Sequence, residues 1–344
     1  MQSSMPMPMP SELAVPEIWC PIPVRVHPES ATAEERLLAW CLEHDLLRSE
    51  AAIERFKGCR YGTFVAYTYP DVVDLDLMCQ WNAVNFLLDD LIDETAPADG
   101  LDLARGLLAQ LTVGVPLPEA PKPASPLEAA QRDIWERAAS RRSLDWQLRV
   151  VGHTRDWLAS TVLQSTRHGA DAIPSTEAFC RSRRLHSGQT MSLDYIEAGL
   201  DRELPADLAN SDPYREMVAA VNDAIGWHND AFSVEKELAR GDYDLLPAVL
   251  AHNEKMPWPQ AIARTGTMSE AATREFVGAA EDLRAMGPLF ASAPGSIEDA
   301  ITWYGAWLSG SLHWHRRSGR YSDVVVVAAG EMPAHIEPHL TAAA

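Results

Sequence analysis

The sequence is short of positive charge. Lysine and arginine number 29 against 49 aspartates and glutamates, which gives a formal net charge of −20. This excess of negative charge disfavours nucleic acids and anionic membranes as principal partners, because both would be repelled. An anionic small molecule would need metal ions, or a local cluster of arginine and lysine, in order to bind.

Cysteine is also scarce, and long apolar runs are lacking. The five cysteines lie far apart without a C-x-x-C pair, so neither a disulfide framework nor a zinc site is predicted. No apolar run approaches the roughly 20 residues of a membrane-spanning helix. The first residues lack the basic and apolar regions of a signal peptide. We therefore predict a soluble, cytoplasmic protein without a membrane span.

Strand-like alternation of apolar and polar residues is missing as well, and no repeat is found. Apolar residues instead recur at spacings of three and four, as in amphipathic helices. We predict a single all-α domain over 31–322, between an extended, proline-rich N-terminal segment (1–30) and a C-terminal tail (323–344). The expected helices begin near residues 31 and 71 and then cover about 101–112, 127–168, 175–199, 212–240 and 296–315, with a break near Gly62 and shorter helical segments over 245–289.

Acidic residues interrupt one apolar helical stretch, FLLDDLIDE at 86–94. Asp89 and Asp93 are four residues apart and therefore lie on one helix face, with Asp90 beside them. Carboxylates among apolar residues are costly to bury unless they are paired or bind a metal. A metal site and a solvated acidic helix end are the two alternatives for this acidic motif.

A second polar motif is NDAFSVEKE at 229–237. Its Asn229, Ser233 and Glu237 are four residues apart, so their side chains follow one helical stripe. Oxygen ligands on two helices suit hard cations such as Mg²⁺, which commonly share their coordination with phosphate. We predict that the two helices face each other and hold a metal–diphosphate cluster. A charge-rich exposed helix is the alternative for the second motif.

The two motifs resemble the aspartate-rich motif and the N-D-x-x-S-x-x-K-E motif of bacterial class I terpene cyclases. Further segments similar to that family are CPIPVRVHP near the start, YTYPD before the acidic motif, SRRLHSG at 182–188 and WHRRSGRY at 314–321. The resemblance therefore covers nearly the whole chain. It implies a class I terpenoid synthase-like helical bundle around a central active-site cavity. It also implies an enzyme that ionises and cyclises a linear isoprenyl diphosphate and releases diphosphate.

The resemblance assigns the metal ligands residue by residue. Asp89 would ligate two of three Mg²⁺ ions, with Asp93 assisting. The third ion would be held by Asn229, Ser233 and Glu237.

The same resemblance assigns the diphosphate contacts. Arg183 would be the diphosphate sensor, because it lies at the separation from Asn229 that the family keeps. Lys236 would contact the diphosphate, and Arg320 and Tyr321 would reach it when the site closes. Asp90 would pair with a basic side chain in that closed state.

Within SRRLHSG, Arg184 is the alternative to Arg183 and is expected to be a surface charge. His186 and Ser187 occupy the family's linker and effector positions. The main-chain carbonyl of Ser187, presented at a helix break, would matter more than its side chain.

An allylic cation needs a dry, mostly apolar pocket, and aromatic faces stabilise it by cation–π attraction. Phe86 is our first candidate for this role and Trp314 the second, with core packing as the alternative for both. For His228 and His315 we expect structural hydrogen bonds. No protein base is identified, and the released diphosphate could serve as one.

The chain length of the substrate is inferred from small residues at the expected wall of the pocket, because small side chains leave room for a longer substrate. Asn85 and Ser192 stand where some relatives have aromatic side chains, and Cys59 and Ala224 are further small candidates for the pocket wall. We therefore predict geranylgeranyl diphosphate and a diterpene product, with farnesyl diphosphate and a sesquiterpene as the alternative. A chain-elongating prenyltransferase and a non-catalytic helical scaffold are competing classes. A homodimer is possible, since dimers are the commonest soluble oligomers.

Overall fold

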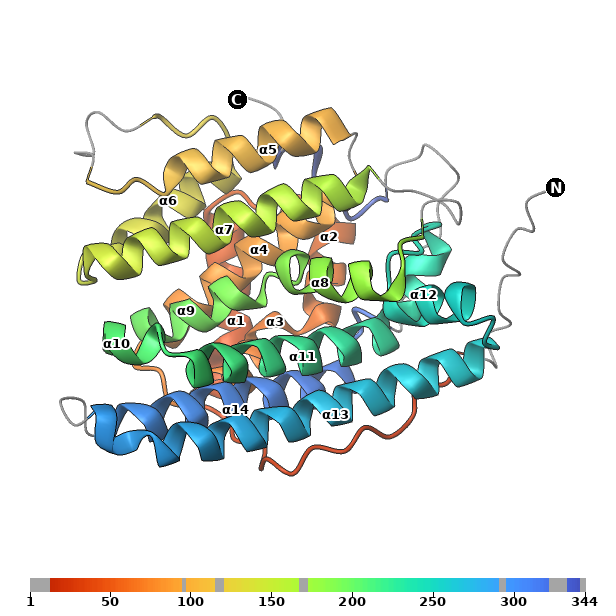
Figure 1. Cartoon of the computed structure of the whole chain (residues 1–344). Coiled ribbons are helices and arrows are strands. Elements are labelled where there is room, and N and C mark those ends of the chain that lie inside the picture. Colours follow the sequence, from red (N-terminus) through yellow and green to blue (C-terminus); the bar gives the residue numbers. More distant parts are fainter. Residues whose placement is uncertain are drawn as a thin grey trace. The chain divides into compact units, whose positions relative to one another are not determined.

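A computed structural model describes residues 13–94, 97–114, 121–166, 173–290, 295–321 and 333–340. Within these ranges the secondary structure is helical and contains no strand (Figure 1). None of the helices in these ranges is long and apolar enough to cross a membrane. The chain divides into two compact units, each made of separate stretches. Unit 1 comprises Met1–Val24, Thr166–Thr190 and Leu204–Val326, and unit 2 comprises Arg25–Ser165, Met191–Glu203 and Val327–Ala344.

Unit 2 is built around one helix, α4. Its helices are α1 (Ser30–Glu43), α2 (Glu50–Cys59), α3 (Tyr61–Thr68), α4 (Leu75–Glu94), α5 (Pro97–Gln110), α6 (Pro126–Ala139), α7 (Leu144–Ser165) and most of α9 (Gln189–Gly199), with the 3-10 turn η5 (Pro338–Leu340). Helix α4 packs against α1, α3, α5, α6 and α7. The acidic motif is therefore carried by the helix with the most neighbours in this unit.

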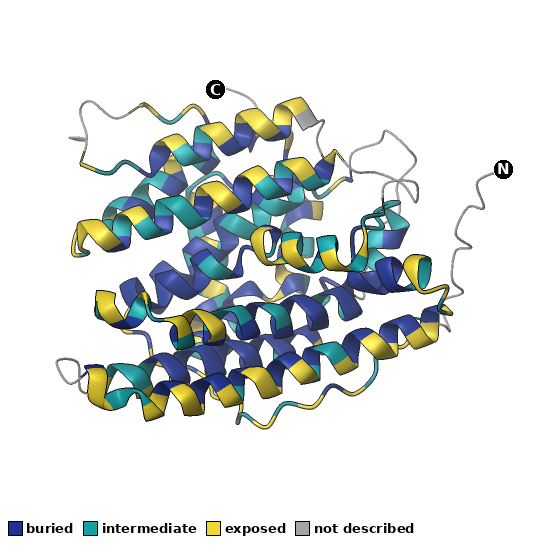
Figure 2. Cartoon of the chain, viewed as in Figure 1, coloured by how far each residue is buried: buried dark blue, intermediate teal, exposed yellow. Residues whose placement is uncertain are grey.

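Unit 1 is organised by the long helix α11. Its helices are α8 (Thr176–His186), α10 (Ala206–Ala209), α11 (Asp212–Ala239), α12 (Leu246–Asn253), α13 (Trp258–Ala285) and α14 (Ser296–His315), with the 3-10 turn η4 (Gly287–Phe290) and the first two residues of α9. Helix α13 runs back along α11, and α8, α12 and α14 also contact α11. Much of α11 is buried as a result, whereas α13 keeps one exposed face (Figure 2).

Serine side chains begin several of these helices. The hydroxyls of Ser49, Ser125 and Ser175 accept hydrogen bonds of 3.1 to 3.2 Å from the backbone N–H group three residues later. Such caps satisfy donors that have no partner within the helix. In α6 the cap is followed directly by Pro126, which suits a first helical turn.

Three details differ from the helices expected from periodicity. The described part of the stretch 127–168 is divided between α6 and α7, because Ser143 caps a new helix by accepting a hydrogen bond from the backbone N–H of Trp146. The stretch 175–199 is divided between α8 and α9 at Gly188, whose φ of +67° is a conformation that glycine adopts without strain. The supposedly short segments over 245–289 include α13, which has 28 residues.

The break expected near Gly62 lies two residues earlier, at Arg60, which has a φ of +58°. Gly62 itself permits a close approach of α3 to α1. A β-carbon at this position would lie 2.8 Å from the backbone of Ala33 and Glu34. Any other residue would push the two helices apart.

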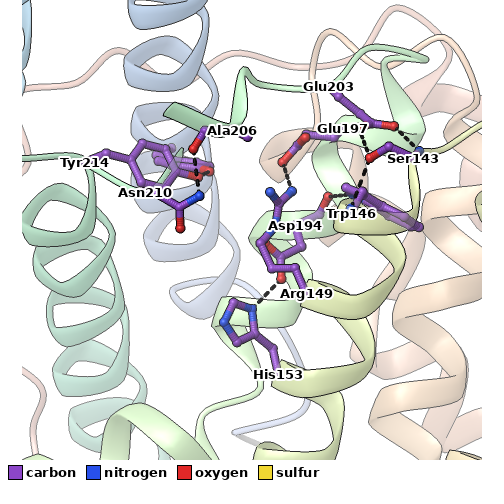
Figure 3. Close-up of polar contacts among 11 residues, drawn as sticks. Ser143, Trp146, Arg149, His153, Asp194, Glu197, Glu203, Ala206, Asn210 and Tyr214 are labelled. Carbon is purple, nitrogen blue, oxygen red and sulfur yellow. Dashed lines mark hydrogen bonds and ion pairs between the residues drawn. The ribbon is translucent and has the colours of Figure 1, made fainter. Parts of the chain in front are cut away.

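A buried ionic network joins α7 to α9 within unit 2 (Figure 3). Nε of Arg149 donates to Oδ1 of Asp194 at 2.9 Å, and its Nη2 donates to Glu197. Nδ1 of His153 lies 2.5 Å from the other oxygen of Asp194. The side chains of Asp194 and Glu197 are only 7% and 1% exposed, and carboxylates at such depth need partners of opposite charge.

The C-terminal segment 333–340 packs within unit 2 as well. Oε1 of Glu337 accepts hydrogen bonds of 2.7 Å from the backbone N–H groups of Arg48 and Ser49, just before α2. Nε2 of His339 lies 2.7 Å from the carbonyl oxygen of Asp45. Leu340 is buried, so the segment is held by both polar and apolar contacts.

Candidate active site

Helix α11 in unit 1 carries the second motif. Asn229, Ser233 and Glu237 lie on one face of this helix because they are four residues apart. Ser233 is buried, and Asn229 and Glu237 are half-buried. Their amide, hydroxyl and carboxylate oxygens form a ligand set that suits Mg²⁺.

The side-chain amide of Asn229 forms hydrogen bonds with residues that are distant in sequence. Nη2 of Arg183, from α8, donates to its Oδ1 at 2.9 Å. Its Nδ2 donates to the hydroxyl of Tyr321 at 3.1 Å and lies 3.0 Å from Nε2 of His315. The predicted sensor Arg183 and two residues of WHRRSGRY (314–321, here called the closing segment) therefore contact the same predicted metal ligand.

His315 is held in one tautomer. Its Nδ1 lies 2.7 Å from the carbonyl oxygen of Ser311, which can only accept, so Nδ1 carries the proton and Nε2 accepts from Asn229. Burial lowers the pKa of His315 to about 4, so the ring is neutral at physiological pH. Burial also lowers the pKa of His228, whose Nε2 lies 3.1 Å from the hydroxyl of Ser311. Both rings make structural hydrogen bonds.

Cationic side chains gather around Glu237. Nζ of Lys236 lies 3.2 Å from one carboxylate oxygen, and Nη1 of Arg240 lies 3.7 Å from the other. Burial alone would raise the pKa of Glu237, but the charges of Lys236, Arg240 and Arg320 outweigh it and lower that pKa. An ionised carboxylate favours a bound cation, and the neighbouring positive charges favour a bound anion.

The closing segment spans the last residues of α14 and the turn after it, and several of its side chains are buried in unit 1. Trp314, Arg320 and Tyr321 are 2%, 4% and 9% exposed. The rings of Trp314 and Tyr321 meet edge to face, with centroids 5.7 Å apart. The ring of Tyr321 also stacks on His315 at 4.9 Å. These contacts are compatible with core packing for Trp314, the alternative to a role beside the cation.

Arg184 and Ser187 occupy the end of α8. Arg184 forms two hydrogen bonds of 2.6 Å with the carboxylate of Asp223, and its side chain is 49% exposed. Arg184 therefore forms a surface ion pair, in keeping with the expectation that it is a surface charge. The hydroxyl of Ser187 donates to Oδ1 of Asn222 at 2.8 Å, directly before the break at Gly188. His186, at the linker position, is buried.

Asp230 is a feature that sequence reasoning missed. Nε of Arg183 donates to its Oδ1 at 2.9 Å, and the backbone N–H of Leu246 donates to its Oδ2 at 3.0 Å. Burial raises the pKa of Asp230 to about 6, while the charge of Arg183 acts in the opposite direction. In the sequence, its position beside Asn229 was the only indication of a role, since both of its hydrogen-bond partners are distant in sequence.

The acidic motif lies on α4 in unit 2. Asp89, Asp90 and Asp93 are all half-buried there. On the same helix, the ring of Phe86 stacks on Tyr61 with centroids 4.3 Å apart and meets Phe64 edge to face at 5.5 Å. Phe86 is thus one member of an aromatic cluster and is itself only half-buried.

Asp90 lines a small cavity of about 30 Å³ in unit 2 together with the basic residue Arg55. The other lining residues are Leu47, Ala52, Phe56, Cys59, Tyr61, Leu87, Leu91, His335, Ile336, Glu337 and Leu340. A basic side chain therefore lines the same cavity as the aspartate that was predicted to pair with one.

The four small residues considered for the pocket wall are Cys59, Asn85, Ser192 and Ala224. The amide of Asn85 turns back and donates to the carbonyl oxygen of Trp81 at 2.7 Å. The carbonyl oxygen of Ser192 accepts from the hydroxyl of Tyr69 at 3.0 Å. The side-chain amide of Asn85 and the main-chain carbonyl of Ser192 are thus engaged by the protein itself.

Within the described ranges, no group of three or more histidine, cysteine, aspartate or glutamate side chains is arranged to hold a metal ion. The second motif is nevertheless suited to a metal, because two of its three ligands are an amide and a hydroxyl oxygen.

Comparison with known proteins shows what the chain is similar to. Residues 80–275, more than half of the chain, match the family model described as terpene synthase family 2, C-terminal metal binding. This stretch includes both oxygen-rich motifs and Arg183. Pristinol synthase of Streptomyces pristinaespiralis is 29% identical over 323 residues, covering 90% of this chain and 86% of that protein.

A further relative has a name that states its substrate. The 4-epi-cubebol synthase of Streptosporangium roseum, described as cyclising (2E,6E)-farnesyl diphosphate, is 26% identical over 324 residues, covering 90% of this chain and 93% of that protein. Among solved structures, α-eudesmol synthase aligns with a TM-score of 0.79 at 23% identity, covering 88% of this chain and 99% of that one. This likeness confirms the predicted all-α fold.

Proposed function

Because this chain belongs to the bacterial class I terpene cyclases of terpene synthase family 2, we propose that it converts farnesyl diphosphate into a cyclic fifteen-carbon terpene. The class of activity, a carbon–oxygen lyase acting on phosphates, follows from membership of the family. The choice of substrate is supported by the relative from Streptosporangium roseum, which is described as cyclising farnesyl diphosphate and aligns with 90% of this chain.

This proposal corrects the sequence-based prediction of geranylgeranyl diphosphate, which was inferred from small residues at the pocket wall. The relatives do not support the diterpene assignment and fit the sesquiterpene alternative better. The physical reason is that the volume of a pocket depends on all of its walls. Small residues at Asn85 and Ser192 enlarge it only if larger side chains elsewhere do not fill the space.

We further propose Mg²⁺ as the metal, with three ions bound. A metal-binding family supports a divalent cation, and oxygen ligands favour Mg²⁺ among the candidates. Asp89 and Asp93 would contribute from the acidic motif, and Asn229, Ser233 and Glu237 from the second motif. When bound, Mg²⁺ neutralises the charge of the diphosphate and polarises the breaking carbon–oxygen bond.

Basic side chains would bind the diphosphate itself. Arg183 and Arg320 can each offer two parallel N–H groups to phosphate oxygens, whereas Lys236 acts as a point charge. The hydroxyl of Tyr321 would add a further donor. Asp90 would pair with a basic side chain when the site closes, and Arg55, which lines the same cavity, is a suitable partner.

The carbocation would be formed away from water and beside aromatic rings. Phe86 and Trp314 are the proposed aromatic contacts, each contributing about 0.5–2 kcal/mol by cation–π attraction. The carbonyl of Ser187 would be directed at the reacting carbon from the break between α8 and α9.

We also propose that the enzyme acts in the cytoplasm and binds no nucleic acid. None of the five cysteines, all of which lie in the described ranges, forms a disulfide bond, which suits a reducing compartment. Cell fractionation would test the location, and light scattering after gel filtration would show whether the protein is a homodimer.

The experiment that tests the function is incubation of the purified protein with Mg²⁺ and farnesyl or geranylgeranyl diphosphate, followed by mass spectrometry of organic extracts. A cyclic fifteen-carbon product that disappears with EDTA is expected. A cyclic product from geranylgeranyl diphosphate alone would reverse the choice of substrate, and no cyclic product from either would refute the function. Longer diphosphates after addition of isopentenyl diphosphate would instead identify a prenyltransferase.

Substitution of the metal ligands separates catalysis from a scaffold role. Asp89→Ala and Asn229→Ala should abolish or strongly reduce product formation. Glu235→Ala is the control, because it removes an exposed carboxylate from the same helix as Asn229. If both ligand variants keep full activity, the two motifs are surface charge.

A further inference from the structure

We propose that Asp230 is a positioning residue that fixes the guanidinium of Arg183 for the substrate diphosphate. The inference rests on the proposed function, since it assumes that Arg183 binds diphosphate. It concerns a carboxylate that is neither a predicted metal ligand nor a predicted substrate contact.

The two carboxylate oxygens of Asp230 accept hydrogen bonds from two different helices of unit 1. Oδ1 accepts the hydrogen bond of 2.9 Å from Nε of Arg183 on α8. Oδ2 accepts the hydrogen bond of 3.0 Å from the backbone N–H of Leu246, the first residue of α12. Because its side chain is only 3% exposed, water does not compete effectively for either oxygen.

The start of α12 explains why Asp230 cannot move freely. The residue before this helix, Leu245, offers no side-chain cap. An N–H group at the start of a helix has no partner inside the helix, and Asp230 supplies one from α11. The carboxylate is thus held by α12 on one side and holds Arg183 on the other.

Two contacts then determine the orientation of the guanidinium. Nε is bonded to Asp230 and Nη2 to Asn229, each at 2.9 Å. A guanidinium has five N–H groups in one plane, so two bonded nitrogens fix that plane. Among the described residues, Arg183 has no hydrogen bond through Nη1. The Nη1 edge is therefore the one that remains for a phosphate oxygen.

Removal of Asp230 would change the affinity for diphosphate in opposite directions, depending on whether its charge or its positioning of Arg183 dominates. Its negative charge weakens the attraction between Arg183 and an anion, so loss of the charge alone would tighten diphosphate binding. Loss of positioning would weaken binding, because the planar fork of arginine binds phosphate well only when it is aligned. The sign of the change in affinity therefore distinguishes the two effects.

The test is calorimetric titration of the full-length protein with inorganic diphosphate in the presence of Mg²⁺. Asp230→Ala should weaken the affinity by about 10-fold or more, as expected for loss of a charge-assisted hydrogen bond. Asp223→Ala is the matched control, because it removes a carboxylate from the same helix that pairs with Arg184 instead. The control should bind diphosphate as the wild type does. Unchanged or tighter binding by a folded Asp230→Ala protein would overturn the proposal.

A second variant covers the case in which Asp230→Ala does not fold. Asn at position 230 keeps the shape and one acceptor oxygen, so it can serve Arg183 or Leu246 but not both. Asp230→Asn should therefore bind diphosphate about 3- to 10-fold more weakly, a smaller loss than that of a whole charge-assisted bond. Affinity equal to or above that of the wild type would contradict positioning here too.

A double variant shows whether Asp230 acts through Arg183. If it does, Asp230→Asn should weaken diphosphate binding in the wild-type background but not in the Arg183→Ala background. Equal effects in both backgrounds would point to a general structural role and refute the inference. Wild-type protein that neither binds diphosphate nor forms a cyclic product would refute the proposed function instead.

Discussion

Tyr321 accepts a hydrogen bond of 3.1 Å from the side-chain amide of Asn229, and these two residues come from the closing segment and the second motif of the same unit. The ring of Tyr321 is held separately, by stacking on His315. The hydroxyl and the ring of one residue thus have different partners, and a substitution can remove one without the other.

Tyr321→Phe should weaken Mg²⁺-dependent binding of inorganic diphosphate by about 2- to 10-fold, the usual range for one neutral hydrogen bond. The ring and its stacking are retained, so thermal stability should change little. Tyr304→Phe is the control, since it removes a tyrosine–tyrosine hydrogen bond elsewhere in unit 1 and should leave diphosphate affinity unchanged. Equal affinity of Tyr321→Phe and wild type would argue against a contact with diphosphate.

Phe86→Leu tests the choice between a role beside the cation and core packing. Leucine keeps an apolar side chain but has no π face. We expect turnover of farnesyl diphosphate to fall by about 2- to 30-fold, the equivalent of one cation–π contact, with a changed ratio of products by gas chromatography. If the unfolding free energy falls while turnover per folded molecule is constant, Phe86 only packs against Tyr61.

Arg149→Met should be strongly destabilising, because it leaves the buried carboxylates of Asp194 and Glu197 without their arginine. Breaking a buried ion pair in this way costs about 3–5 kcal/mol. Arg155→Met, on the same helix, is the matched control, since Arg155 pairs with Asp156 at the surface. Urea unfolding of both variants should show a large loss for the first and less than about 1 kcal/mol for the second.

His153 should make stability depend on pH. Burial lowers its pKa, but the hydrogen bond and charge of Asp194 outweigh burial and raise the pKa above the ordinary value of 6.5. The charged ring therefore stabilises the folded state fully below pH 6.5, and this contribution is lost as pH rises through the folded-state pKa. Urea unfolding between about pH 5 and 8 should show it. In His153→Gln that part of the pH dependence should disappear, and an unchanged profile would contradict the assignment.

Local patterns predicted much of the fold. The spacing of apolar residues revealed the helices, and the four-residue spacing of Asn229, Ser233 and Glu237 placed them on one face of α11. The break after Ser187 was expected from the similarity of SRRLHSG to a known segment. Each of these features depends on residues that are close together in the sequence.

Partners that are distant in sequence could not be predicted. Nothing in the sequence shows that Asp230 bonds the backbone of Leu246, or that Arg149 reaches Glu197. The predicted substrate length, which the relatives do not support, suffers from the same difficulty. It was inferred from individual residues such as Asn85, whereas the size of a pocket is a sum over all of its walls.

The contact of Glu337 with the backbone N–H groups before α2 bears on how the protein can be shortened. A chain cut after residue 332 would lose the acceptor for Arg48 and Ser49 and would expose apolar surface that Ile336 and Leu340 cover. Such a product should be cleaved faster by proteases than the intact chain, because α2 would open more often. Expression designs should therefore keep these last residues as an integral part of unit 2.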